Sequence, residues 1–151
     1  MIVTARSSSP SDTLGLGRAL AQQLRAGDIV LLAGRLGCGK TLFAAGVAEG
    51  LGAQEQVTSP SFVIVHSYEG FLPIVHADVY RLGSTGEFDD LELPEAARDG
   101  VLLIEWGDAV TAVLPPDHLI VEITITGEEE RTVRFVPVGA WESRSLGELE
   151  S

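Results

Sequence analysis

The sequence of 151 residues has no asparagine, one cysteine and one lysine. Its lone cysteine, Cys38, excludes an internal disulfide and favours a reducing compartment. The longest apolar runs, such as residues 29–33 and 101–104, are far shorter than the roughly 20 residues that a membrane-spanning helix needs. The first twelve residues have neither a basic leader nor a long apolar core. We therefore expect a cytoplasmic protein that has no contact with a membrane.

Basic residues are also scarce, because 10 of them stand against 22 acidic residues and the net charge is -12. Such a chain repels phosphate backbones on average, and the sequence has no basic stripe that would focus their binding. If nucleic acid is involved in the function, we expect a partner to hold it. The length fits a single domain over residues 1–151, with a tail after about residue 138 that is either a short helix or frayed.

The hydrophobic pattern of the first third of the chain predicts a helix, a strand and a second helix. The first helix is expected to have Ser11 or Asp12 as its cap and to run to about Arg25, with leucines on one face. Residues 28–34 form a nearly all-apolar run bounded by glycines, which indicates a strand covered on both faces. Residues 41–52 read as a helix that a glycine closes.

The rest of the chain is rich in strand patterns. "VLLIEW" indicates another buried strand, "FVIVHSY" and "LPIVHADVY" indicate a hairpin or adjacent pair, and "DHLIVEITIT" with "RTVRFVPV" indicates an antiparallel pair. An acidic segment at 84–100 is expected to hold short helical turns. We therefore predict an α/β fold of the three-layer P-loop NTPase type, with a mostly parallel central sheet and an antiparallel extension.

The only lysine lies in "GRLGCGKT", residues 34–41, which matches the pattern G-x-x-x-x-G-K-[ST]. Glycines at these positions let successive backbone N–H groups point at phosphate oxygens, and the helix that follows adds its positive end. Lys40 would neutralise the β- and γ-phosphates, and the Thr41 hydroxyl would bind Mg²⁺. The wide guanidinium of arginine does not fit there, which explains why a chain with nine arginines keeps this lysine.

The pattern predicts a nucleotide-binding site. Its candidate binding residues are those of the loop and one more distant arginine. Arg131 could stack on an adenine, although a plain surface position on a strand is an equally good interpretation. Cys38 is better explained as a small filler of the loop than as a nucleophile, although its thiol could make binding sensitive to oxidation. The candidate binding residues are Gly34, Leu36, Gly37, Cys38, Gly39, Lys40, Thr41, Leu42 and Arg131.

Two carboxylates, Asp78 and Glu105, stand at the ends of apolar runs. Strands of a P-loop fold carry functional groups at their carboxyl ends, where an acid holds Mg²⁺ or orients the attacking water. Each could instead be a surface acid at the point where its strand emerges. The three histidines, His66, His76 and His118, have no close metal-ligand spacing, so we interpret them as packed or half-exposed residues and predict no zinc site.

Five stretches taken together resemble the bacterial TsaE family of P-loop ATPases. They are "GRLGCGKT", "VTSPSF", "HADVYRL", "LLIEW" and "LPPDHLIVEI", in this order. The resemblance runs from the first helix to about Val136 and implies an ATPase that acts in tRNA threonylcarbamoyladenosine biosynthesis. By the same resemblance it works with the synthase subunits TsaD and TsaB and reaches tRNA, next to the anticodon, only through that complex.

The resemblance also implies roles for single residues. Thr41 and Glu105 would ligate Mg²⁺, and Asp78, with Lys40 and Glu105, would carry catalysis of ATP hydrolysis. Trp106 would lie near the nucleotide or the partner face, although the pattern alone fits an ordinary core aromatic equally well. A switch-like loop near the γ-phosphate would consist of Ser59, Pro60 and Ser61.

Three other functions are alternatives to this one. A guanine-nucleotide switch needs [NT]-K-x-D, which a chain without asparagine and with its only lysine at position 40 does not contain. A small-molecule P-loop kinase is the stronger alternative, but such kinases add an arginine-rich lid, whereas residues 84–100 are acidic. A binding module that uses ATP to set its conformation differs from the ATPase mainly in turnover.

Overall fold

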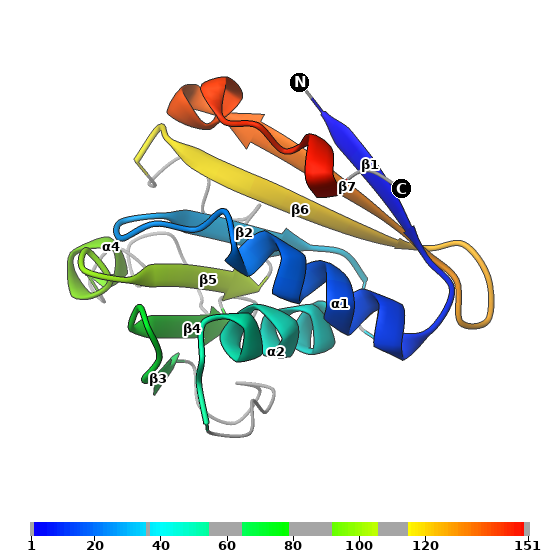
Figure 1. Cartoon of the computed structure of the whole chain (residues 1–151), viewed down its shortest axis with the longest axis horizontal. Helices are drawn as coiled ribbons and strands as arrows, with labels where there is room; N and C mark the ends of the chain where they lie inside the picture. The colour runs from blue at the N-terminus through cyan, green and yellow to red at the C-terminus, as the bar shows by residue number, and fades with distance from the viewer. Residues whose placement is uncertain (1, 36, 55–64, 79–91, 106–114, 150–151) are drawn as a thin grey trace.

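In the computed structural model, the chain folds around one sheet (Figure 1), and the structure describes residues 2–35, 37–54, 65–78, 92–105 and 115–149. Seven strands of the described residues follow the order β1-β7-β6-β2-β5-β4-β3. The strands are β1 (Val3–Ser7), β2 (Ile29–Ala33), β3 (Val65–Tyr68), β4 (Ile74–Asp78), β5 (Val101–Glu105), β6 (His118–Ile125) and β7 (Arg131–Val138). The helices are α1 (Pro10–Ala21), α2 (Lys40–Gly50) and α4 (Leu93–Ala96), with the 3₁₀ turns η2 (Gly139–Ser143) and η3 (Gly147–Leu149).

The middle of the sheet is parallel and its two sides are antiparallel. Strand β2 pairs in parallel with both β5 and β6, and β4 pairs in parallel with β5. Strands β6, β7 and β1 continue the sheet on one side in antiparallel order, and β3 closes the other side against β4. This arrangement confirms the predicted α/β fold with a mostly parallel centre and an antiparallel extension.

Side chains of the buried strands alternate between two apolar layers, as the period of a strand requires. Val30 and Leu32 of β2 belong to the larger layer, which lies under α1 and α2, whereas Ile29 and Leu31 belong to the layer on the opposite face. Figure 1 shows α1 and α2 side by side on one face of the sheet. On the opposite face, Leu93 of α4 packs with Leu31 and its neighbours. Burial on both faces explains why these strands are nearly continuous apolar runs.

Helices α1 and α2 approach each other closely through glycines. A Cβ atom at Gly46 of α2 would lie 2.1 Å from the carbonyl oxygen of Leu14, and one at Gly17 of α1 would lie 2.3 Å from that of Phe43. Neither position has room for a side chain unless the helices separate. Since α2 begins directly after the glycine-rich loop, this packing fixes the loop against α1.

The first helix differs from its prediction at both ends. It begins at Pro10, with Ser9 as the N-cap whose Oγ accepts a hydrogen bond from the Asp12 amide at 3.1 Å, and it ends at Ala21. The predicted cap at Ser11 or Asp12 was therefore wrong, because proline is well suited to the first helical position and the cap is the residue before it, Ser9. The predicted end near Arg25 was also too late.

The two ends of the described chain are built into the fold. Strand β1, which was not predicted, pairs with β7, so that Val3 stands opposite Phe135. For the tail, the short-helix alternative is correct: η2 and η3 bury Trp141 and Leu149 in the larger apolar layer. None of the helices in the described residues has the length and apolar character to cross a membrane.

Candidate functional site

The loop between β2 and α2 depends on glycine for its conformation. Gly34, Gly37 and Gly39 have φ angles of 148°, 81° and 113°, a region that other residues rarely adopt. At Gly34 a Cβ atom would also lie 2.5 Å from the Ile123 carbonyl oxygen and 2.6 Å from the Cys38 sulfur. The chain can therefore wrap in this way only with the glycines that the motif supplies.

The N-terminus of α2 is open to an anion. Gly39 is the N-cap, and no side chain of the described residues caps the helix there. The first N–H groups of a helix have no partner within it, and the helix dipole adds about half a positive charge at that end. The first turn of α2, which Lys40 and Thr41 begin, therefore offers both donors and a favourable potential to a phosphate group.

The ammonium group of Lys40 lies inside the loop. Its Nζ donates hydrogen bonds to the carbonyl oxygens of Gly34 at 2.7 Å and Arg35 at 3.0 Å, and the residue is 4% exposed. These bonds hold a positive charge among the backbone amides of the loop. The loop and the helix end thus combine three features that favour phosphate: the amide donors of the first helical turn, the dipole and a lysine.

The predicted carboxylates, Asp78 and Glu105, come together at one edge of the sheet. They end the adjacent parallel strands β4 and β5, where they stand directly opposite each other in register. Both are buried, with exposed fractions of 6% and 4%. Because Val101 and Leu103 of β5 belong to the layer under α2, the alternation of the strand directs Glu105 to the same side.

Glu105 lies next to Thr41 at the start of α2. The Thr41 hydroxyl oxygen is 3.3 Å from one carboxylate oxygen of Glu105 and 3.4 Å from the other. Neighbouring oxygen ligands of an octahedral Mg²⁺ ion are about 3 Å apart, since each Mg–O bond is about 2.1 Å long. A hydroxyl and a carboxylate at this separation are hard oxygen donors that fit one magnesium coordination sphere.

A histidine that the sequence analysis placed among packed residues belongs to this cluster. Nε2 of His76 lies 2.7 Å from Oε2 of Glu105, and His76 is 0% exposed. The signal was present in the sequence, because His76 precedes Asp78 by two positions on β4 and a strand directs such residues to the same face. Its contact with Glu105, on another strand, was not visible in the sequence.

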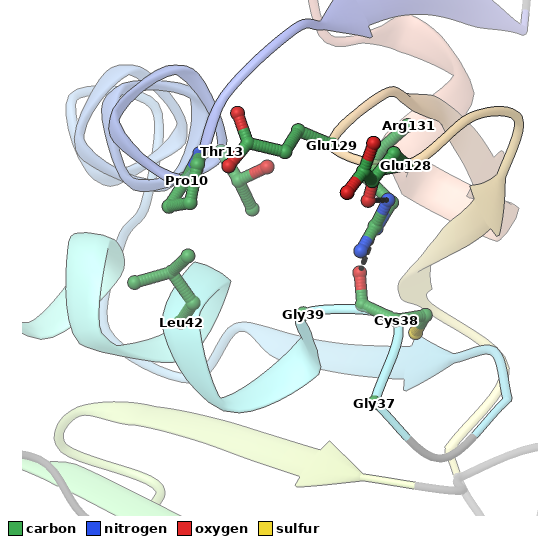
Figure 2. Close-up of a pocket in the computed structure, with 9 residues that line it drawn as sticks. All are labelled: Pro10, Thr13, Gly37, Cys38, Gly39, Leu42, Glu128, Glu129 and Arg131. Atoms are coloured by element: carbon green, nitrogen blue, oxygen red, sulfur yellow. Dashed lines mark hydrogen bonds between the residues drawn. The ribbon is translucent and has the colours of Figure 1, made fainter.

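Arg131, at the start of β7, ties the loop to the β6–β7 turn. Its Nε donates to the Cys38 carbonyl oxygen at 2.9 Å, as Figure 2 shows, and its Nη1 donates to the carbonyl oxygens of Gly127 at 3.2 Å and Glu130 at 2.9 Å. A pocket of about 280 Å³ lies between the loop, α1, α2 and this turn. Figure 2 shows the side chains that line it. Its lining residues are Pro10, Thr13, Gly37, Cys38, Gly39, Leu42, Glu128, Glu129 and Arg131.

Cys38 is a packed residue of the loop. It is 1% exposed, and its sulfur is 3.9 Å from Nζ of Lys40. Burial raises the pKa of the thiol above its ordinary value of 9.0, although the nearby charges of Lys40 and Arg131 oppose this effect in part. A thiol that holds its proton is a poor nucleophile, which agrees with the interpretation of Cys38 as a filler.

The structure describes ten of the fifteen predicted site residues and leaves five outside its description. Leu36, the three switch-loop residues Ser59, Pro60 and Ser61, and Trp106 lie outside the described residues. Of the other two histidines, His66 stacks on Tyr68 of β3, and Nδ1 of His118 bonds the Pro115 carbonyl oxygen. The predicted residues that lie in or around the loop are Gly34, Gly37, Cys38, Gly39, Lys40, Thr41, Leu42, Asp78, Glu105 and Arg131.

Comparison with known proteins gives consistent results. Residues 7–133 match the sequence model of the family described as threonylcarbamoyl adenosine biosynthesis protein TsaE. The chain is 44% identical over 128 residues to the Streptomyces coelicolor protein named tRNA threonylcarbamoyladenosine biosynthesis protein TsaE, covering 82% of this chain and 86% of that one. It is 40% identical over 136 residues to the Bacillus subtilis protein of the same name, covering 89% and 85%.

The fold also matches a solved structure. The crystal structure of Bacillus subtilis YdiB superimposes with a TM-score of 0.77 at 36% sequence identity, covering 94% of this chain and 90% of that one. At this coverage, the likeness extends over nearly the whole chain.

Proposed function

This chain belongs to the TsaE family of threonylcarbamoyl adenosine biosynthesis proteins, and on that premise we propose that it is a magnesium-dependent ATPase that acts in the formation of threonylcarbamoyladenosine in tRNA. The observation that carries this proposal is the contact between Thr41 and Glu105 beside the open end of α2. A phosphate-binding loop next to a pair of oxygen donors is what a magnesium nucleotide requires.

The loop and Lys40 would bind the phosphates of ATP. The ammonium group, which now donates to the carbonyl oxygens of Gly34 and Arg35, lies in the concave face of the loop where the β- and γ-phosphates would come. Glycine at 34, 37 and 39 leaves the backbone amides accessible, and each amide donates without the loss of side-chain entropy that a flexible donor would suffer.

Thr41 and Glu105 would hold Mg²⁺, which when bound neutralises charge on the phosphate oxygens. Asp78 stands beside Glu105 at the end of the neighbouring strand and is 6% exposed. A carboxylate in this position can accept a hydrogen bond from the water that attacks the γ-phosphate and so orient it. Asp78 therefore would act as the water-positioning group, with Lys40 stabilising the negative charge of the phosphates.

The base of the nucleotide would occupy the pocket of Figure 2. This pocket is lined by Gly39 and Leu42 at the start of α2, directly beside the loop that would hold the phosphates. Arg131 contributes the planar group of the lining that can stack on a base, and it is held in place by the Cys38 carbonyl oxygen.

We propose TsaD and TsaB as the proteins with which this ATPase acts. Support comes from the family and from the charge of the chain, which is -12 and therefore unsuited to holding tRNA by itself. In this proposal the partners bind the tRNA, and this chain hydrolyses the ATP that the threonylcarbamoyladenosine-forming cycle uses. Its place would then be the cytoplasm, where tRNA is modified.

Turnover of ATP by the purified protein tests this function. The rate is measured with Mg²⁺ for the protein alone and after addition of TsaB, TsaD and tRNA, with Lys40→Ala as the inactive control. We expect a slow rate alone and a faster rate with the partners. A rate indifferent to the partners, but raised by a small metabolite that becomes phosphorylated, would replace the ATPase with a small-molecule kinase.

A further inference from the structure

The buried histidine of β4 makes a polar contact with the proposed metal ligand. His76 is 0% exposed, Nε2 lies 2.7 Å from Oε2 of Glu105, and Nδ1 has no hydrogen-bond partner among the described residues. We propose that His76 is a positioning residue that orients the Glu105 carboxylate for Mg²⁺, an inference that rests on the magnesium site proposed above.

The cost of burying His76 argues that the contact is its purpose. A buried ring nitrogen without a partner lowers stability, whereas a leucine in the same layer would carry no such penalty. Two of its neighbours on that face, Ile74 of β4 and Leu103 of β5, are apolar. Among the described residues, the hydrogen bond of His76 is to Glu105, so packing against apolar side chains does not by itself account for a histidine here.

The geometry fixes one oxygen of Glu105 and leaves the other to the metal. Thr41 is 3.3–3.4 Å from both carboxylate oxygens and therefore does not select between them, whereas His76 contacts Oε2 alone at 2.7 Å. As a metal ligand the carboxylate only accepts hydrogen bonds, so Nε2 carries the hydrogen and donates it. Oε2 is then engaged, and Oε1 is the oxygen that His76 leaves for the ion.

The ring itself is held by its surroundings. Tyr68 of β3 packs against His76 with the ring centroids 6.3 Å apart. The ring of His66 in turn stacks on that of Tyr68, with the centroids 4.6 Å apart. His76 stands opposite Leu103 in the register, one diagonal step from Glu105. A ring fixed by packing on one strand can therefore restrict the rotamers of a long carboxylate on the next, as hydrogen-bonded partners of metal ligands generally do.

The test measures how much Mg²⁺ strengthens ATP binding, as the ratio of the ATP dissociation constants in EDTA and in excess Mg²⁺. In His76→Leu we expect this ratio to fall by about 10–100-fold, the usual effect of losing a partner of a metal ligand, while the EDTA affinity stays within about twofold. His76→Gln should keep most of the ratio, because its amide N–H can reach the position of Nε2. His76→Asn should lose it, because its shorter amide cannot.

The matched control is His118→Leu. His118 is also buried, its Nε2 has no hydrogen-bond partner within the described part of the chain, and it lies at the opposite end of the parallel strands. This variant should leave the ratio unchanged. The double variant His76→Leu with Glu105→Gln should match Glu105→Gln alone within about twofold, since His76 acts only through Glu105.

Three results overturn the inference: an unchanged ratio in both His76→Leu and His76→Asn, equal losses in His76→Leu and His118→Leu, or additive losses in the double variant. If His76→Leu does not fold, the comparison of His76→Gln with His76→Asn tests the inference instead. A different pattern marks failure of the proposed function: the wild type then shows no effect of Mg²⁺ on ATP binding, or Glu105→Gln leaves that effect intact.

Discussion

Thr41 and Glu105 are 64 positions apart in the sequence, yet the hydroxyl of one lies 3.3 Å from the carboxylate of the other. Parallel pairing of β2 with β5 produces this contact, because it brings the end of β5 beside the loop that leads from β2 into α2. The contact joins the phosphate-binding half of the site to its acidic half. Substitutions that remove a single oxygen atom can test this contact.

Removal of the Thr41 hydroxyl should weaken the binding of magnesium nucleotide. Thr41→Val keeps the shape of the side chain but removes the oxygen, so we expect the gain in ATP affinity from Mg²⁺ to fall by about tenfold or more. Thr41→Ser keeps the oxygen and should retain most of that gain. Fluorescence titration with a labelled ATP analogue, with and without Mg²⁺, measures both variants, and equal behaviour of the two would contradict the assignment.

The glycines between α1 and α2 should be sensitive to a single methyl group. Gly46→Ala places a Cβ atom 2.1 Å from the Leu14 carbonyl oxygen, so the helices must separate, and we expect a loss of about 1–3 kcal/mol in the free energy of unfolding. Gly15→Ala is the matched control, since a Cβ atom there meets nothing within 4 Å. It should stabilise helix α1 by about 0.5–1 kcal/mol.

Urea unfolding followed by circular dichroism measures both glycine variants. The prediction concerns the difference between the two positions, so the choice of denaturant does not affect it. The packing argument would be contradicted if Gly46→Ala were as stable as Gly15→Ala.

Stability should fall at alkaline pH because of Cys38. Burial raises the pKa of its thiol in the folded state above the ordinary value of 9.0. The unfolded chain therefore loses this proton at a lower pH than the folded protein does. The stability that the protonated Cys38 thiol contributes is complete below about pH 9 and is lost as the pH rises through the higher pKa of the folded state.

Cys38→Ala removes this titration and provides the comparison. Thermal melts from pH 8 to pH 11 should show that the wild type loses more stability than the variant above pH 9. Parallel curves for the two proteins would mean that Cys38 ionises equally easily in both states. The comparison requires a reducing agent, so that oxidation of the thiol does not contribute.

Arg131 should contribute to nucleotide affinity by holding the loop. Arg131→Gln removes the bond from Nε to the Cys38 carbonyl oxygen and the bonds to the β6–β7 turn, so we expect ATP to bind about tenfold more weakly. Arg134→Gln is the control, because Arg134 lies on the same strand but pairs with Glu122 at the surface. Calorimetric titration that gave equal affinities for both variants would remove Arg131 from the site.

The part of the site that could be predicted from the sequence is the part whose chemistry is local. Eight consecutive residues supply the glycines, Lys40 and Thr41, and the apolar run before them identifies the strand that leads into the loop. Asp78 and Glu105 were also identifiable, because each ends a buried run and the carboxyl ends of parallel strands meet at one edge. No contact between distant residues is needed for either inference.

The features that were missed depend on pairing between distant segments. His76 meets Glu105 only because β4 and β5 align Asp78 with Glu105. Strand β1 contains alanine, arginine and serine, which have little strand propensity, and it is held by β7, whose partner residues are more than 120 positions away. The start of α1 was missed for a local reason, since Ser9 and Ser11 are both good caps and only the place of Pro10 distinguishes them.

Calorimetric titration of the purified protein with ATP, in the presence of Mg²⁺, tests the central claim most directly when the wild type is compared with Lys40→Ala. The account predicts one binding site in the wild type, no measurable binding in Lys40→Ala, and no rescue in Lys40→Arg, whose planar fork does not fit the loop. Undiminished affinity in Lys40→Ala would contradict the assignment of the loop as the phosphate site.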